Sequence, residues 1–510
     1  ENAVLASAGI TFVLPFLLFV AAAGVLADRF SKRNILVIAK VVEVGVAAAG
    51  VAAFVAGWPI ALYLILFLMA THSAFFGPSK YGIVPELVYR AQLSRANAMI
   101  QTFTYLAIII GTTVAPLLSQ MTEHRYGLAS VICVAVAAVG LAAALRIERT
   151  PRAGSEARVS WHFVRDIWRT LARIRSDGYL LLAVIASAFF LLLGAYLQFN
   201  LIPYAVHELG LVKETGTYLF LLVAVGIGLG SLLAGRISGR NVELGVVPMG
   251  ALGLALACLL LGSWAHSVFG VGFALLLAGV GSGLFIVPIE AWIQFRSPSK
   301  QRGEILAASS FLGWVGVLIA SGLVYLLGEV LGLSAREGFV VIGVLTLLLT
   351  VTTLRVLPDF FLRFLGVLIT RFVYRLRIIG AENVPLEGPA LLVCNHVSYV
   401  DALLLLATQQ RRIRFIMERE IFETRLLKPL FKLMGLIPIS FRDSPKKIVT
   451  SLHAAREALD DGWLVCIFGE GAITRSGSLL SFKSGFEHIV KDSNIPIVPV
   501  YLGGAWGSIF

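Results

Sequence analysis

Long runs of apolar residues, separated by short polar turns, fill about the first two thirds of the chain. Each run is near the ~20 residues that a helix needs to cross the hydrocarbon core of a bilayer. We predict eleven membrane-spanning helices, at roughly 10–27, 35–56, 59–76, 97–119, 127–146, 178–200, 217–235, 245–264, 268–290, 305–327 and 338–356. Because this number is odd and the sequence starts with Glu1 rather than Met, we expect that a first helix is missing.

The pattern changes near Leu357, where charged residues return and the apolar runs shorten to the length of strands. The fold class predicted is therefore an all-α polytopic membrane domain followed by an α/β domain. We place the membrane domain at 1–357, with halves at 1–146 and 178–357 and a cytoplasmic linker at 147–177. An amphipathic segment at 358–380 is suited to the membrane interface. The α/β domain follows at 381–510, and we expect it to be cut short at its C-terminal end.

Composition agrees with a membrane protein, since 58% of the 510 residues are hydrophobic and 14% are charged. The net charge of +12 could serve to bind nucleic acid, to bind anionic lipid or to orient the helices in the membrane. Its position favours topology, because Lys and Arg concentrate in alternate short loops, beginning with 28–34, whereas the opposite side has only Arg125, Lys213 and Arg336. By the positive-inside rule these basic loops and the C-terminal domain are cytoplasmic. We expect no nucleic-acid partner.

The four cysteines are scattered, without the spacing of a metal or redox site, and we predict no metal.

An internal repeat suggests a transporter. The loop containing Asp28, Arg29, Lys32 and Arg33 recurs in the second half, where Arg236 and Arg240 stand at the positions of Arg29 and Arg33. The first copy, Gly-Val-Leu-Ala-Asp-Arg-Phe-Ser-Lys-Arg, resembles the loop between helices two and three of the major facilitator superfamily, with Ser31 in place of the usual glycine. We interpret these six residues as a gate, in which an acid and several bases form pairs that break on opening.

Polar groups within the predicted spans are costly and so are candidates for a substrate cavity. Glu43 is the clearest candidate, with Lys40 one turn away as its predicted partner. Gln101, Gln198 and Asn200 are weaker candidates, since helix-to-helix hydrogen bonds explain amides at least as well.

Three sequence blocks carry candidate chemistry in the last third of the chain. A buried strand at 390–394 is followed by Asn395, His396 and Asp401, and a carboxylate at this spacing can orient a histidine. The block Phe-Gly-Glu-Gly-Ala-Ile-Thr-Arg follows at 468–475, and Ile-Pro-Ile-Val-Pro-Val at 495–500. In order and spacing these blocks resemble the glycerolipid acyltransferase family, with Gly469 in place of proline and Ile473 in place of arginine.

The resemblance implies acyl transfer without an acyl-enzyme, with His396 as the general base and Asp401 as its partner. It further implies that the acceptor, including its phosphate, is bound by Asn395, Arg442, Glu470, Gly471 and Arg475. The acyl donor would be a thioester of acyl carrier protein or coenzyme A, and no bound cofactor is expected.

The whole chain is similar to bacterial fusions of a major facilitator lysophospholipid transporter with an acyltransferase of the 2-acylglycerophosphoethanolamine type. This similarity implies a bacterial inner-membrane protein that flips a lysophospholipid, with lysophosphatidylethanolamine favoured, and reacylates it. The partners implied are acyl carrier protein and anionic membrane lipids. Two alternatives remain: a membrane-anchored lysophosphatidic acid acyltransferase with an unrelated or vestigial transporter, and a transporter with a regulatory acyltransferase-like domain.

Overall fold

The computed structural model describes residues 2–123, 125–160, 162–239, 242–263, 267–356, 358–385, 388–409 and 411–507. The chain divides into two compact units, Glu1–Arg355 and Val356–Phe510. The first unit is helical and the second contains a parallel sheet.

Within its described residues, the first unit has eleven helices that are long and apolar enough to span a membrane. This confirms the predicted number. The first half holds α1 (Asn2–Arg29), α2 (Lys32–Ala56), α3 (Pro59–Gly82), α5 (Leu93–Met121) and α6 (Tyr126–Leu145), with the short α4 (Val84–Leu87) and η1 (Arg90–Gln92). The amphipathic α7 (Phe163–Ile174) joins it to the second half. The second half holds α8 (Gly178–His207), α9 (Lys213–Ser238), η2 (Leu244–Val246), α10 (Val247–Ser263), α11 (Val268–Arg296), α12 (Arg302–Tyr325), the π turn η3 (Leu326–Val330) and α13 (Ala335–Val356).

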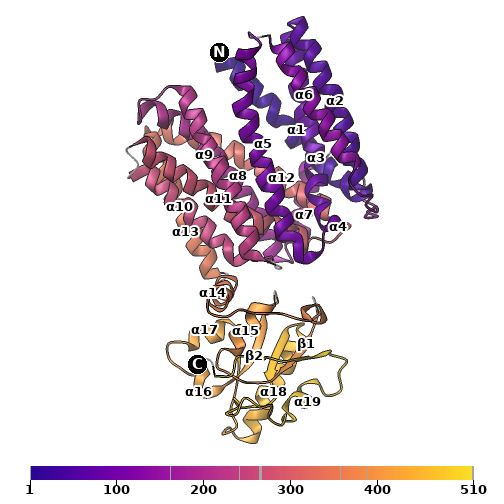
Figure 1. The fold of residues 1–510 in the computed structure, drawn as a ribbon, viewed down its shortest axis with the longest axis vertical. Coiled ribbons are helices and arrows are strands. Elements are labelled where there is room, and N and C mark those ends of the chain that lie inside the picture. The colour runs from indigo at the N-terminus through magenta and orange to yellow at the C-terminus, as the bar shows by residue number, and fades with distance from the viewer. Residues whose placement is uncertain are drawn as a thin grey trace. The chain divides into compact units, whose positions relative to one another are not determined.

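Two seams join the halves of the helical unit. Helix α1 packs along α12, and α5 packs along α9, so each seam pairs one helix from each half (Figure 1). Gly24 of α1 lies against Gly303 of α12, where an added Cβ atom would come within 2.6 Å of the Gly303 carbonyl oxygen. Small residues at such crossings allow two backbones to approach closely.

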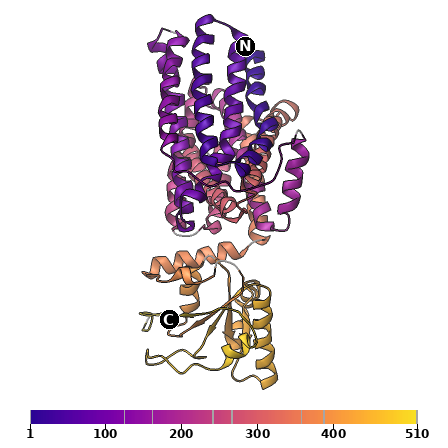
Figure 2. The same ribbon diagram turned by 90° about the vertical axis from the view of Figure 1, so that its right-hand side faces the viewer.

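The second unit begins with α14 (Pro358–Val373), inside the segment for which we predicted an amphipathic structure, and α14 packs on α15 (Asp401–Thr408) (Figure 2). Its described strands form one parallel sheet in the order β3-β2-β4-β1-β5. The strands are β1 (Ala390–Cys394), β2 (Ile413–Glu418), β3 (Ile437–Ile439), β4 (Leu464–Phe468) and β5 (Ile497–Val500). The other helical segments are η4 (Ala381–Asn383), α16 (Arg419–Phe422), α17 (Lys428–Leu433), α18 (Pro445–Asp460) and α19 (Gly485–Val490).

Alternate residues of the central strands fill two cores, one on each face of the sheet. Leu392, Cys394 and Phe415 pack toward α15, whereas Leu391 and Val393 pack against α18 and α19. A sheet covered on both faces offers its free surface at the ends of its strands, and in open parallel sheets ligands bind beyond the carboxyl ends. The first sequence block follows β1, the second begins at the last residue of β4, and the third contains β5. This edge of the sheet therefore positions the candidate site.

Substituting Gly250 with alanine should destabilise the helical unit. A Cβ atom at Gly250 would lie 2.6 Å from both the Gly281 carbonyl oxygen and the Phe285 amide nitrogen, so α10 would be pushed from α11. Overpacking of this kind costs about 1–3 kcal/mol. We expect a lower unfolding temperature in detergent, measured by intrinsic fluorescence. The matched control is Gly322→Ala in α12, where an added Cβ would meet nothing within 4 Å and where alanine favours the helix. Equal unfolding temperatures for both variants would contradict the prediction.

Candidate functional site

His396 and Asp401 meet at the turn between β1 and α15. Nδ1 of His396 lies 2.8 Å from Oδ2 of Asp401, and the Asp401 side chain is fully buried. The same oxygen accepts hydrogen bonds from the backbone N–H groups of Val397, at 2.7 Å, and Ser398, at 2.9 Å. An ionised carboxylate here favours a proton on Nδ1, which leaves Nε2 to accept a proton from a substrate. The structure thus brings together the two residues predicted to be catalytic.

The His396 ring is held from a second direction by Phe468, the last residue of β4. The two rings are stacked, with centroids 4.1 Å apart. About 20% of the His396 side chain is exposed, so the ring is oriented by the protein and still reachable by a ligand.

Glu470, which we predicted to bind substrate, is buried and contacts the backbone of the protein in this structure. It is 2% exposed, and its two carboxylate oxygens accept hydrogen bonds from the backbone N–H groups of His396 and Leu480, each at 3.0 Å. Asn395 likewise bonds the backbone of Leu502, donating at 3.0 Å and accepting at 2.7 Å. Because these groups satisfy one another inside the protein, Glu470 and Asn395 hold the loops of the site together.

Cys394 lies directly before the site but is unsuited to act as a nucleophile. Burial, and then the nearby Asp401 and Glu470 carboxylates, raise the pKa of its thiol to about 12. The thiol therefore stays protonated near neutral pH, and proton transfer by His396 is the chemistry that this turn favours.

Among the described residues, no group of three or more His, Cys, Asp and Glu side chains is arranged to hold a metal ion.

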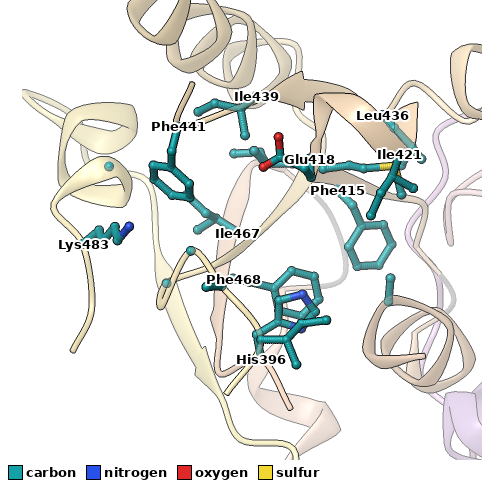
Figure 3. A pocket seen from close by; sticks show the side chains of 18 of the residues that line it. His396, Phe415, Glu418, Ile421, Leu436, Ile439, Phe441, Ile467, Phe468 and Lys483 are labelled. Atoms are coloured by element: carbon teal, nitrogen blue, oxygen red, sulfur yellow. The ribbon is translucent and has the colours of Figure 1, made fainter. Parts of the chain in front are cut away.

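A cavity of about 1700 Å³ opens over the carboxyl ends of the strands. Figure 3 shows His396 and Phe468 on one side of it, with Phe415, Ile421 and Leu436 forming an apolar wall. This volume exceeds the range of about 300–1,000 Å³ that is usual for small-ligand sites. It can hold long apolar chains beside the histidine.

Of the two arginines predicted to bind phosphate, only Arg475 lines this cavity. Arg442 is an exposed surface residue that pairs with Glu420 at 2.6 Å, and it is absent from the lining. The structure supplies another cation, Lys483, whose Nζ lies 3.6 Å above the Phe441 ring, facing the cavity (Figure 3). No sequence motif pointed to Lys483, although it is the first cation after Arg475 in the chain.

Gly471, also predicted to bind substrate, lines the cavity with a positive φ of 67°. An added Cβ atom there would lie 2.5 Å from the Phe441 ring, so this turn requires glycine for both its backbone and the space beside it. Glu418, at the end of β2, is a second lining residue that the sequence analysis missed.

At the membrane unit, the predicted gate residue Asp28 lies at the seam between α1 and α12. Its carboxylate accepts hydrogen bonds from the backbone N–H groups of Gly303, at 2.7 Å, and Glu304, at 2.9 Å, in the first turn of α12. The partner of this acid is therefore a helix N-terminus and not the neighbouring bases, which corrects the pairing that we expected. A carboxylate at a helix N-terminus satisfies free N–H groups and the helix dipole.

The bases of the gate loop have other partners. Lys32 is fully buried and pairs with Glu86 at 2.5 Å. Arg33 donates to the carbonyl oxygens of Leu145 and Ile147 at the end of α6. Arg29 stacks on its neighbour Phe30. The equivalent Arg236 is exposed at the end of α9, and Arg240 lies outside the described residues.

The cavity candidates separate into two groups. Glu43 and Lys40 form the predicted ion pair at 2.6 Å, and His72 of α3, which the sequence analysis missed, approaches Glu43 at 3.4 Å. Gln101 is buried, whereas Gln198 is exposed. The Asn200 amide donates to the Ala335 carbonyl oxygen at 2.7 Å, so it ties α8 to α13.

Comparisons with known proteins agree with both units. The model of the Major Facilitator Superfamily matches residues 2–320 and 184–361, and the model of the Acyltransferase family matches residues 375–503. The lysophospholipid transporter LplT of Serratia proteamaculans is 28% identical over 318 residues, covering 61% of this chain and 76% of that protein. LplT of Klebsiella pneumoniae is 29% identical over 328 residues, covering 61% and 77%.

Solved structures share the fold of the helical unit. The human organic anion transporter MFSD10 superposes with a TM-score of 0.56 at 18% identity, covering 68% of this chain and 82% of that one. The E. coli fucose:proton symporter FucP gives a TM-score of 0.56 at 17% identity, covering 68% and 89%. The protein is thus a multi-pass membrane protein that belongs to the Major Facilitator Superfamily and carries an acyltransferase domain in its C-terminal part.

Proposed function

We propose that this chain moves lysophospholipid across the bacterial inner membrane and transfers an acyl group from a thioester to the glycerol hydroxyl of that lipid on the cytoplasmic side. The His396–Asp401 pair, set in a large and mainly apolar cavity, is the observation that carries the proposal. The relatedness of the helical unit to lysophospholipid transporters supports the choice of lipid.

The acyl transfer is a direct displacement at the thioester carbonyl. Nε2 of His396 takes the hydroxyl proton while the glycerol oxygen forms a bond to the carbonyl carbon, and the imidazolium formed is stabilised by Asp401. The C–S bond then breaks, and His396 returns the proton to the departing thiolate. Coenzyme A and acyl carrier protein both offer such a thioester.

The phosphate of the acceptor would lie between Arg475 and Lys483. Both residues line the cavity that contains His396, and cations of this kind form charge-assisted hydrogen bonds to phosphate. Both side chains are exposed to solvent, so a phosphate that enters the cavity can reach them.

The Asp28 contact would act as the gate of the transporter. It fixes the N-terminus of α12, in one half, to the end of α1, in the other half. Rocking of the halves would require this seam to open, and the close contact of Gly24 with Gly303 would open with it.

Replacing His396 with alanine should lower acyl transfer about 10²–10⁴-fold, the contribution of a general base. Asp401→Asn should also reduce the rate strongly, because an amide no longer stabilises the charged imidazole. The measurement is product formation in detergent from a labelled acyl thioester and lysophosphatidylethanolamine, with unfolding temperature as the folding control. A His396→Ala variant with wild-type turnover would exclude the proposed chemistry.

Arg475→Ala and Lys483→Ala should each raise KM for the lipid acceptor roughly tenfold, since each removes a charge-assisted hydrogen bond worth about 1.5–3 kcal/mol. Arg442→Ala is the matched control, because Arg442 pairs with Glu420 away from the cavity, and its KM should stay close to that of the wild type. If Arg442→Ala had the largest effect, this assignment of the phosphate site would be wrong.

Asp28→Asn should slow delivery of lipid without harming catalysis. Asparagine has one acceptor oxygen where Asp28 uses two, so one N–H group of α12 would face an amide nitrogen. Leaving that N–H unsatisfied weakens the seam by about 1–2 kcal/mol, enough for a roughly tenfold shift between conformations. In sealed vesicles, with lysophosphatidylethanolamine added only on the side opposite the enzyme, product should form roughly ten times more slowly. In detergent the same variant should match the wild type. Wild-type rates in sealed vesicles would instead favour an acyltransferase whose membrane part is an anchor.

A further inference from the structure

The charges that line the acyltransferase cavity are unevenly distributed. The lining includes three histidines and four cations, which are Arg456, Arg475, Lys483 and Lys491. Among the described lining residues, Glu418 supplies the one carboxylate. It is half-buried at the carboxyl end of β2, where Figure 3 shows it between Phe441 on one side and Phe415 on the other.

The neighbours of Glu418 do not neutralise it. Arg419 pairs with Asp443 at 2.8 Å, and Glu420 pairs with Arg442 outside the cavity. Among the described residues, neither a hydrogen bond nor an ion pair reaches the Glu418 carboxylate. Its surroundings are the apolar side chains of Ile421, Leu436 and Ile439.

A carboxylate beside an apolar wall is unfavourable once ligand displaces water, unless the ligand brings a positive charge. We propose that Glu418 binds the ammonium group of the acceptor headgroup, and so selects an ethanolamine lysophospholipid over acceptors that carry only negative charge. This inference rests on the proposed acyl transfer and names its substrate class.

Under this proposal, a zwitterionic lipid would meet the cavity at three points. The glycerol hydroxyl would face His396, the phosphate would face Arg475 and Lys483, and the ammonium would face Glu418. Phe415 adds an aromatic ring near Glu418, and aromatic faces attract ammonium groups. The headgroup of lysophosphatidic acid has no cation, and phosphates of the acyl donor would be repelled by the carboxylate.

The test compares three acceptors in detergent, where transport does not limit the reaction. The full-length protein and its Glu418→Gln variant are assayed with lysophosphatidylethanolamine, lysophosphatidylglycerol and lysophosphatidic acid, and with one labelled acyl thioester. We expect kcat/KM for the ethanolamine lipid to fall roughly tenfold in the variant, the loss of one ionic contact. The values for the two anionic lipids should stay the same or rise. Glu418→Asp should restore part of the preference for ethanolamine.

Glu420→Gln is the matched control, since it removes the same charge two residues away on the surface and should leave the preference unchanged. Activity of Glu418→Gln on lysophosphatidylglycerol reports that the variant is folded, and its unfolding temperature checks this independently.

Equal losses on all three acceptors, or no change on any, would overturn the headgroup assignment. So would a wild-type protein that prefers lysophosphatidic acid, a result that requires no variant. If the wild type acylates none of the three lipids, the proposed function itself fails, and the inference fails with it.

Discussion

Within each unit of this protein, buried carboxylates that accept backbone hydrogen bonds hold separate segments in place. A buried carboxylate without partners is costly, so each one constrains the segments whose N–H groups surround it. Asp401 fixes the turn after β1, and Glu470 joins that turn to the loop at Leu480. Asp28 performs the same task between α1 and α12. The contacts of Glu470 with His396 and of Asp28 with Gly303 link segments that are far apart in the sequence. The geometry of the proposed catalytic pair and of the proposed gate depends on the positions that these carboxylates set.

The shape of the acyltransferase cavity follows from the sheet beneath it. Parallel strands covered on both faces leave their carboxyl ends free, and the turns that follow β1 and β4 bring His396 and the loop at Gly471 to that edge. Most strand ends are apolar, which suits acyl chains, whereas Arg475 and Lys483 come from the segment between β4 and α19. A substrate that is part hydrocarbon and part phosphate matches this division, because each part meets the surroundings that it prefers.

Joining a transporter and an acyltransferase in one chain has a physical advantage under the proposed function. Lipid released by the first unit would be at high effective concentration for the second, without any additional contact between them. Acylation would also remove the transported lipid and so draw further transport inward. The two proposed activities can be tested separately, since the Asp28 contact and the His396–Asp401 pair use different residues in different units.

The amino-acid sequence by itself determined the features that depend on local patterns. The eleven spans follow from apolar runs of bilayer length, and the His396–Asp401 pair follows from a short spacing at a strand-to-helix turn. Only the tertiary structure decided which distant groups meet. Asp28 contacts the first turn of α12, and Glu470 and Asn395 form hydrogen bonds with the backbone. Arg442 lies outside the acyltransferase cavity, whereas Lys483 and Glu418 line it. These outcomes depend on contacts between loops from separate strands, and no periodicity or spacing along the chain encodes such contacts.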